Sequence, residues 1–300
     1  MSRLLSLTLL LMSFLAVITS KGAITESTKT KTAVILVHGA FGSASVWDQV
    51  KTRLSNFAYD VEAVQLPSVG KNAANLERTA DIKVVQKAIR KRVHQGRGGG
   101  QNVILVGNSY GATVIGDAVK DFEKLSSVSP AAPAQGKILG LIMLSGFIPY
   151  ITEVTTQDHL DIRLISPSWF RFQGTSLVYW DNDLKNYPPS VTLFTLLEKD
   201  AAASTVSSLA PSSFVALNAT AQYIPYTGTF RCLYVVGAHD NAVPAALSQS
   251  YIDQPGAKFE VLTIDGDHEP QLCRPDTVVQ VIRRFIGEKI YKIDGQVWMS

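Results

Sequence analysis

Cysteine, clustered basic residues and metal-ligand motifs are all scarce in this 300-residue sequence. It contains no H-E-x-x-H motif and no His, Cys and Asp cluster at metal-ligand spacing, so we expect neither a metal nor an organic cofactor. The net charge is +3, from 28 basic and 25 acidic residues, and the only basic cluster spans residues 90–92. We therefore expect no nucleic-acid partner. A small, fairly neutral molecule is the expected partner, and no oligomeric state is predicted.

The chain has only two cysteines, Cys232 and Cys273. An oxidising compartment could pair them, but their expected positions argue against a bridge. Cys232 begins a predicted strand, whereas Cys273 follows a loop at the opposite end of the neighbouring strand. A strand of five residues is about 17 Å long, well beyond the ~7 Å that separates bridged Cα atoms. We therefore expect two free thiols.

Long hydrophobic runs are also scarce, and the only one begins the chain. Residues 4–18 are apolar or small, and Arg3 is the only charge among the first 20 residues. A positive start, a short apolar stretch and a small residue such as Ser20 indicate a secretory signal peptide over residues 1–20, and hence a secreted protein. The run is shorter than the ~20 residues of a membrane-spanning helix. Ile18 is not the small residue preferred before a cleavage site, so an uncleaved anchor tethered to a membrane is the alternative.

The rest of the chain alternates short apolar strands with amphipathic helices. Such alternation predicts one α/β domain with a mainly parallel sheet covered by helices on both sides. Buried strands are expected over residues 33–37, 61–66, 102–106, 137–145, 230–236 and 259–264. Helices are expected over residues 44–54, 79–93, 110–124 and 275–287.

One segment, residues 148–225, breaks this alternation. It contains no clear buried strand but many aromatic residues, so we expect a helical lid inserted between the core segments 31–147 and 226–290. Residues 291–300 would form a C-terminal tail.

The aromatic residues of the insertion predict part of a substrate pocket. Trp169, Phe170 and Trp180 are the candidates for its lining. The same aromatics could instead form a small core of the insertion, and the two roles are compatible. Asn218, in the triplet Asn-Ala-Thr, would accept a glycan in the secretory pathway.

The strongest chemical motif is Gly-Asn-Ser-Tyr-Gly at residues 107–111, directly between an expected strand and an expected helix. In the pattern G-x-S-x-G the serine occupies a sharp, strained turn, and the glycines avoid collisions between the strand and the helix. The turn presents the hydroxyl over the helix N-terminus, whose free N–H groups favour negative charge. We therefore predict that Ser109 is a nucleophile.

A second motif, His-Gly-Ala-Phe-Gly at residues 38–42, ends the first strong strand. Acyl transfer passes through a tetrahedral oxyanion that two preset N–H donors stabilise. We assign these donors to the backbone N–H groups of Ala40 and Tyr110. His38 is expected to brace the loop, and Phe41 to line the pocket.

These motifs together resemble the α/β-hydrolase superfamily, in which a G-N-S-Y-G-type elbow follows the next-but-one strand after an H-G-A-F-G-type loop. The arrangement is most similar to small lidded serine esterases, in the branch that also holds plant methylesterases and hydroxynitrile lyases. The similarity covers residues 33–147 and 229–287, whereas the insertion identifies no subfamily. The resemblance implies an α/β-hydrolase fold and a catalytic triad in the order serine, acid, histidine.

Two late motifs match that order. Asp240 follows a strand at the position of the family's acid, and His268 follows the last strand. His268 would take the proton from the serine and return it to the leaving group, while Asp240 would hold the imidazole. Asp265 and Asp267 are alternatives for the acid, but they lie too near His268 in sequence to reach its far nitrogen comfortably. His239 is expected to line the pocket.

The leading hypothesis is hydrolysis of a carboxylic ester or lactone of a small, fairly apolar molecule through an acyl-Ser109 intermediate. The alternative is a non-hydrolytic lyase or cyclising enzyme that keeps the triad but uses His268 as a base on its substrate. A catalytically silent binding protein is a third hypothesis. Turnover of simple esters would favour the first.

Overall fold

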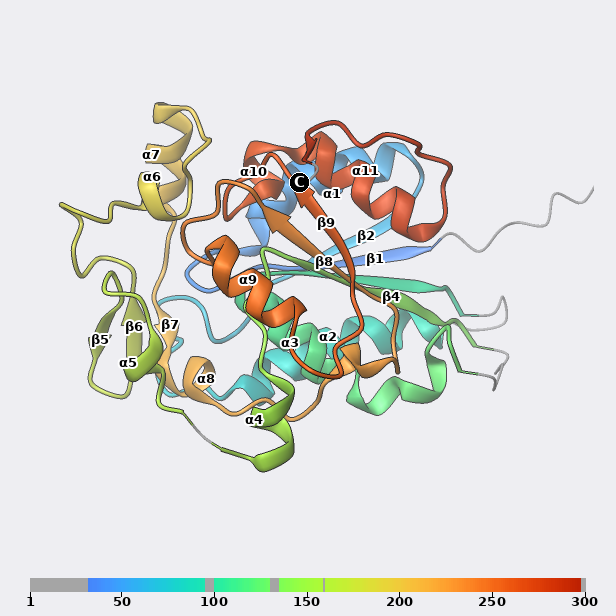
Figure 1. Cartoon of the computed structure of the whole chain (residues 1–300), viewed down its shortest axis with the longest axis horizontal. Helices are drawn as coiled ribbons and strands as arrows, with labels where there is room; N and C mark the ends of the chain where they lie inside the picture. Colours follow the sequence, from blue (N-terminus) through green and yellow to red (C-terminus); the bar gives the residue numbers. More distant parts are fainter. Residues whose placement is uncertain (1–31, 95–99, 130–134, 159, 298–300) are drawn as a thin grey trace, which may run out of the picture.

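The computed structural model describes residues 32–94, 100–129, 135–158 and 160–297, and the expected leader over residues 1–20 lies outside them. Its centre is a seven-stranded sheet in the order β10-β9-β8-β4-β3-β1-β2. Six strands are parallel, and β10 pairs antiparallel to β9 at one edge (Figure 1). The strands are β1 (Ala33–Val37), β2 (Asp60–Val64), β3 (Val103–Asn108), β4 (Ile138–Leu144), β8 (Cys232–Gly237), β9 (Glu260–Ile264) and β10 (Gln296–Val297). The expected mainly parallel sheet is confirmed.

Helices cover both faces of this sheet, as the alternation predicts. One face carries α2, α3 and α9, and the other carries α1 and α11. Neighbouring side chains of a strand enter opposite cores, so that Ile35 packs on the first face and Leu36 on the second. The core helices are η1 (Ala44–Trp47), α1 (Asp48–Asn56), α2 (Arg78–Val93), α3 (Tyr110–Ala118), η2 (Lys120–Leu125), η3 (Pro225–Thr227), α9 (Ala245–Ile252), α10 (Pro270–Cys273) and α11 (Pro275–Ile286).

The register of the central strands brings the motif loops together. Val37, the last residue of β1, pairs with Val64 of β2 and with Gly107 of β3. Because parallel strands present their carboxyl ends at one edge, the loops that follow β1, β3, β8 and β9 gather there.

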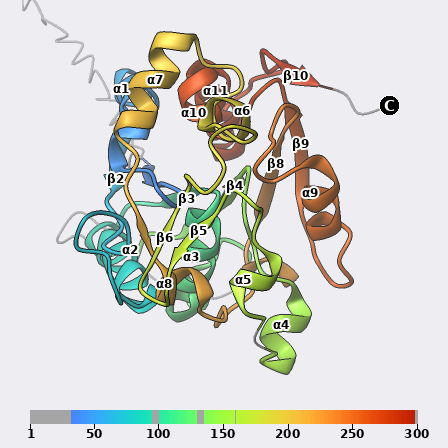
Figure 2. The same cartoon turned by 90° about the vertical axis from the view of Figure 1, so that its left-hand side faces the viewer.

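Residues 148–225 cover that edge of the sheet (Figures 1 and 2). Short helices are present, but the segment also contains a three-stranded antiparallel sheet that sequence patterns did not predict. Its apolar residues form a separate small core around Trp169, Val178 and Phe194, which packs on Phe41. The elements are α4 (Ile151–Thr156), α5 (Ile162–Ile165), β5 (Arg171–Gln173), β6 (Leu177–Tyr179), α6 (Pro189–Thr192), α7 (Lys199–Ser207), β7 (Ser212–Ser213) and α8 (Phe214–Asn218).

Both cysteines are free thiols, which confirms the prediction. Cys232 is buried at the start of β8, and Cys273 lies at the end of α10. Across the part of the chain that the structure describes, no helix has the length and apolarity needed to cross a membrane.

Candidate active site

The turn between β3 and α3 has the geometry that the G-x-S-x-G pattern requires. Ser109 has φ +49°, a left-handed conformation that residues with side chains rarely adopt. A Cβ atom on Gly107 would lie 2.4 Å from the carbonyl oxygen of Gly111. A Cβ atom on Gly111 would lie 2.6 Å from the carbonyl oxygens of Val37 and His38. Both glycines are therefore needed for the strand, the helix and the neighbouring loop to pack at this turn.

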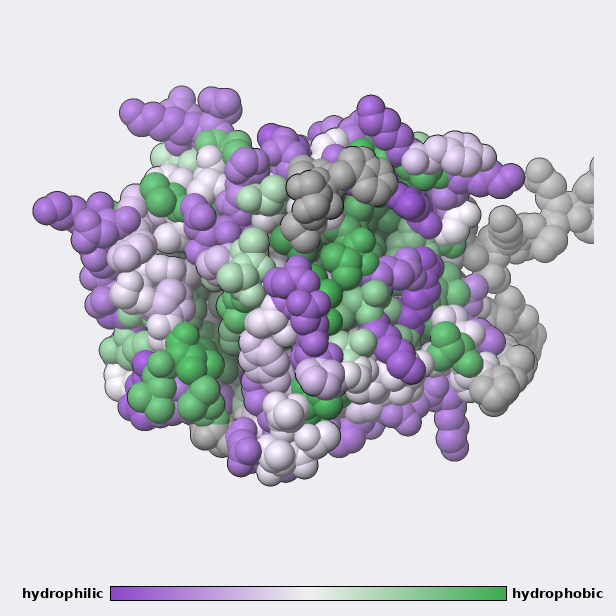
Figure 3. Space-filling model, in the orientation of Figure 1, coloured by the Kyte–Doolittle hydropathy of each residue, from purple (hydrophilic) through white to green (hydrophobic). Residues whose placement is uncertain are grey.

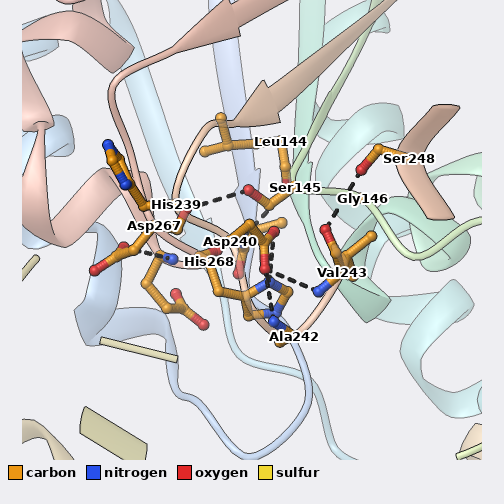
Figure 4. Close-up of polar contacts among 12 residues, drawn as sticks. Leu144, Ser145, Gly146, His239, Asp240, Ala242, Val243, Ser248, Asp267 and His268 are labelled. Carbon is orange, nitrogen blue, oxygen red and sulfur yellow. Dashed lines mark hydrogen bonds and ion pairs between the residues drawn. The ribbon is translucent and has the colours of Figure 1, made fainter. Parts of the chain in front are cut away.

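The loops after β8 and β9 bring Asp240 and His268 together. Nδ1 of His268 lies 3.0 Å from each carboxylate oxygen of Asp240, and both side chains are buried (Figure 4). Oδ1 of Asp240 also accepts the N–H groups of Ala242 and Val243, at 2.9 and 2.8 Å. The carboxylate is thus fixed by the backbone and in turn orients the imidazole ring, the arrangement that an acid–histidine pair needs.

The neighbouring carboxylates raise the basicity of His268. Burial by itself would lower the pKa of this ring, but the charge and hydrogen bond of Asp240, with smaller contributions from Glu269 and Asp267, raise the pKa from 6.5 to about 8. Burial also raises the pKa of the Glu269 carboxyl group to about 8. The neutral imidazole that acts as a base therefore predominates only above about pH 8.

Neither alternative acid contacts the imidazole. Asp265 pairs with Arg274 at 2.9 Å and with His239 at 3.0 Å. Asp267 accepts the backbone N–H of Leu196 at 3.0 Å. His239 does not line the cavity, contrary to the prediction, because its half-exposed ring pairs with Asp265 and points away from Asp240 (Figure 4).

His38 braces the loop after β1, as expected. Its Nδ1–H donates to the Gly39 carbonyl at 2.8 Å, and its Nε2 accepts the N–H of Leu66 at 3.0 Å. Burial lowers the pKa of His38 to about 4, so the ring is neutral at physiological pH. The Gly39 carbonyl and the Ala40 N–H belong to one planar peptide and point in opposite directions. Holding the carbonyl therefore directs the Ala40 N–H away from the His38 ring.

Ala40 and Tyr110 line the same cavity as Ser109 and His268. Among the described residues, no acceptor binds the backbone N–H of Ala40 or of Tyr110. Tyr110 is the first residue of α3, where a helical N–H has no partner within the helix. Two donors are thus available beside Ser109, as an oxyanion hole requires.

Asn108 ties the elbow to the histidine loop. Its Nδ2 donates to the carbonyls of Leu144, at 3.2 Å, and of His268, at 2.9 Å. The Ser109 hydroxyl itself has no hydrogen-bond partner within the described residues. Ser109 and His268 thus line one cavity without a hydrogen bond between their side chains. Catalytic hydrogen bonds are commonly long before substrate binds.

The cavity has a volume of about 110 Å³ and is mostly apolar. Phe41, Trp169 and Phe170, three of the candidates for a substrate pocket, line it. Trp180 does not, because its ring packs against Phe41 in the core of the insertion, with ring centroids 5.9 Å apart. No Asp, Glu, Lys or Arg side chain belongs to the described lining. Further lining comes from Phe147, Ile162, Leu193, Leu217, Val243 and Leu247.

The apolar lining continues to the surface at α5. Ile165 lines the cavity and is half-exposed, and Leu160 and Leu164 beside it are also exposed. Figure 3 shows hydrophobic side chains gathered over this part of the insertion. Asn218 holds α5 in place, since its Oδ1 accepts the N–H of Ile162 at 2.7 Å. This supporting contact was not predicted, and glycosylation of Asn218 stays a prediction.

Within the described residues, no group of three or more His, Cys, Asp and Glu side chains could hold a metal ion. The parallel sheet with helices on both faces, the strained serine turn after β3 and the insertion between β4 and β8 together define the α/β-hydrolase fold. The chain belongs to the alpha/beta hydrolase family, whose model matches residues 34–281.

Similar proteins agree with this assignment. Alpha/beta hydrolase nvfD of Aspergillus novofumigatus is 24% identical over 260 residues, which cover 87% of this chain and 98% of the relative. Methylesterase 7 of Arabidopsis thaliana is 22% identical over 269 residues, covering 83% and 94%. The crystal structure of polyneuridine aldehyde esterase superposes with a TM-score of 0.64 at 18% identity, covering 85% of this chain and 99% of that one. The resemblance to the methylesterase branch is confirmed.

Proposed function

We propose that this protein hydrolyses a carboxylic ester or lactone through an acyl-Ser109 intermediate. The observation that carries the proposal is the single cavity onto which Ser109, His268 and the two unpaired N–H donors all open. Ser109 attacks the ester carbonyl while His268 accepts its proton and Asp240 stabilises the resulting imidazolium. The N–H groups of Ala40 and Tyr110 bind the oxyanion.

The second half of the cycle uses the same groups. His268 returns the proton to the departing alcohol, and the acyl group stays on Ser109. His268 then takes a proton from a water molecule, which attacks the acyl carbonyl and releases the carboxylic acid. The two N–H donors bind the second oxyanion as they bound the first.

The cavity supports a small, neutral and mostly apolar substrate. Its volume is about 110 Å³, and Phe41, Trp169 and Phe170 supply aromatic surface. A carboxylate on the substrate would lose its hydration there without gaining a charged partner, which is unfavourable. We therefore expect neutral esters and lactones with a short or aromatic acyl group to be preferred over esters that carry a free carboxylate.

We would test this proposal by measuring the hydrolysis of neutral aryl esters and lactones. Each substrate would be compared with a counterpart that carries a free carboxylate. We expect Ser109→Ala to lower kcat by about 10⁴-fold or more, whereas Ser208→Ala, on an exposed helix end, should leave kcat unchanged. Full activity in Ser109→Ala would refute the mechanism. Labelling of Ser109 by a fluorophosphonate probe without turnover of any ester or lactone would support the lyase or cyclising alternative. Tight binding of a ligand that stays unchanged, with no loss in Ser109→Ala, would indicate a binding protein.

We also propose that the chain enters the secretory pathway by its first 20 residues. N-terminal sequencing of the protein produced in a eukaryotic host tests this, because a chain that begins at Lys21 has lost its leader. An intact N-terminus in a membrane fraction would indicate the anchored form instead. A mass decrease on deglycosylation that is absent in Asn218→Gln would support a glycan at that residue.

A further inference from the structure

The last strand of the insertion, β7, contacts the loop that carries Ala40. The N–H of Phe41 donates to Oγ of Ser212 at 2.9 Å, and the carbonyl of Phe41 accepts the N–H of Ala210 at 2.9 Å. Ser212 is fully buried, and Phe41 almost so. These contacts join residues about 170 positions apart in the chain, so they form only when the insertion has packed onto the core.

Both peptide groups that flank Ala40 are thus held by hydrogen bonds. The preceding peptide is held through the Gly39 carbonyl by His38, and the following peptide is held through the Phe41 N–H by Ser212. Peptide groups are planar, so fixing the two planes around a residue fixes its φ and ψ. The direction of the Ala40 N–H is therefore set by both contacts.

The loop needs such support because its conformation is strained. Phe41 has φ +64°, in the left-handed region that residues with side chains rarely adopt. A conformation of this kind persists only where the surrounding structure holds it. Without the Ser212 hydroxyl, the Phe41 N–H would be buried without an acceptor. Because an unpaired buried N–H is unfavourable, the peptide between Ala40 and Phe41 would tend to rotate.

β7 is itself anchored to the residue that supplies the second donor. The N–H of Ser213 donates to the Ser68 carbonyl at 2.8 Å, and the N–H of Ser68 donates to Asp81 at 3.0 Å. The Tyr110 hydroxyl donates to the same carboxylate at 2.8 Å. One chain of buried contacts therefore connects β7 to Tyr110, while Ser212 connects β7 to the loop of Ala40.

We propose that Ser212 is a positioning residue of the oxyanion hole, whose hydroxyl aligns the peptide after Ala40 and thereby the Ala40 N–H. The insertion then contributes to transition-state stabilisation as well as to the substrate cavity. Ser212 does not line the cavity and acts through Phe41. This inference rests on the proposed ester hydrolysis.

Ser212→Ala tests the inference with a neutral p-nitrophenyl ester. We expect kcat to fall about 10–100-fold with KM changed less than about twofold, because a misaligned donor weakens oxyanion binding but not ground-state binding. An aryl trifluoromethyl ketone forms a tetrahedral adduct with Ser109, so its affinity should fall by the same factor as kcat. The affinity of the matching unreactive ether, which occupies only the apolar cavity, should stay unchanged.

Ser126→Ala is the matched control. The buried Ser126 hydroxyl also bonds backbone groups, since it donates to the Thr229 carbonyl and accepts the N–H of Val128, but it lies beside the start of β4, at the other edge of the sheet from the site. Its loss should lower the melting temperature without changing kcat or ketone affinity. Ser212→Cys replaces the hydroxyl by a slightly larger thiol that is a weaker acceptor, and its kcat should lie between those of the wild type and Ser212→Ala. It also provides the test if Ser212→Ala does not fold.

Three outcomes would count against the inference or the function beneath it. Unchanged kcat and ketone affinity in a folded Ser212 variant would overturn the inference. Equal losses of ketone and ether affinity would also overturn it, because they would indicate a collapsed cavity. A wild-type protein that neither hydrolyses esters nor reacts with a fluorophosphonate probe would instead refute the proposed function.

Discussion

Two buried histidines, each after a parallel strand of the same sheet, have opposite pKa shifts. His38 follows β1 and binds only backbone groups, and burial lowers its pKa to about 4. His268 follows β9 and faces carboxylates, which overcome its burial and raise its pKa to about 8. Burial lowers the pKa of both rings, so the charge and hydrogen bond of a neighbouring carboxylate decide which imidazole can transfer a proton near neutral pH.

The largest expected difference is in kcat, between a variant without the His268 ring and a variant without the His38 ring. We expect His268→Ala to lower kcat by about 10⁴-fold or more, because the general base is lost. His38→Gln should lower kcat by only about 10–100-fold, because it misaligns one oxyanion donor. Steady-state kinetics on a neutral ester measure both effects, and His239→Ala is a control because its ring faces away from the site. Equal losses of kcat in His268→Ala and His38→Gln would contradict the different roles assigned to the two rings.

The partner of His268 can be changed without removing the ring. Asp240→Asn keeps the size of the side chain but loses its charge, and we expect kcat to fall by about 10²–10⁴-fold. Asp265→Asn should leave kcat almost unchanged, because that carboxylate pairs with Arg274 and His239. Full activity in Asp240→Asn would mean that another carboxylate supports the base.

The neutral state of His38 predicts a loss of stability in acid. Its folded pKa of about 4 lies below the ordinary value of 6.5, so the unfolded chain binds this proton first. The stabilisation is therefore complete above pH 6.5 and is lost as pH falls toward 4, by about 3 kcal/mol in the free energy of unfolding. Urea unfolding at several pH values should give a flatter pH dependence for His38→Gln than for the wild type. Parallel curves would contradict a buried neutral ring.

The smallest effect concerns the pH profile of catalysis. We expect kcat/KM to rise with pH and to reach half of its plateau near pH 8, because only the neutral His268 ring accepts the serine proton. In Asp240→Asn the midpoint should move to lower pH, because the imidazolium loses its charged partner. An unchanged midpoint in this variant would show that Asp240 does not set the pKa of the base.

The frame of the site could be predicted because it depends on local patterns. Apolar runs predicted the strands β1, β3, β4, β8 and β9, and parallel strands place the loops that follow them at one edge. Glycine spacing around Ser109 then predicted the turn itself. The position of His268 beside Asp240 follows from that frame, since each is in the loop that directly follows its strand.

Contacts made by the insertion could not be predicted in this way. β5, β6 and β7 have two or three residues each, too few for an alternating pattern to appear. Ser212 lies in a Pro-Ser-Ser segment that resembles an ordinary loop, and its partner is more than a hundred residues away. His239 was assigned to the pocket because it adjoins Asp240, but both residues follow β8 in a tight turn, closed by the Asp240 N–H donating to the Gly237 carbonyl at 3.2 Å, and there the His239 ring points away from Asp240.

The contact between β7 and the loop after β1 has a consequence for protein engineering. An insertion transplanted whole from a relative would bring its own residue to the place of Ser212. On our proposal, a chimera without an acceptor facing the Phe41 N–H would bind its new substrate and convert it slowly. Grafting residues 148–209 alone would exchange the part of the cavity wall that includes α5, Trp169, Phe170 and Leu193, while retaining β7.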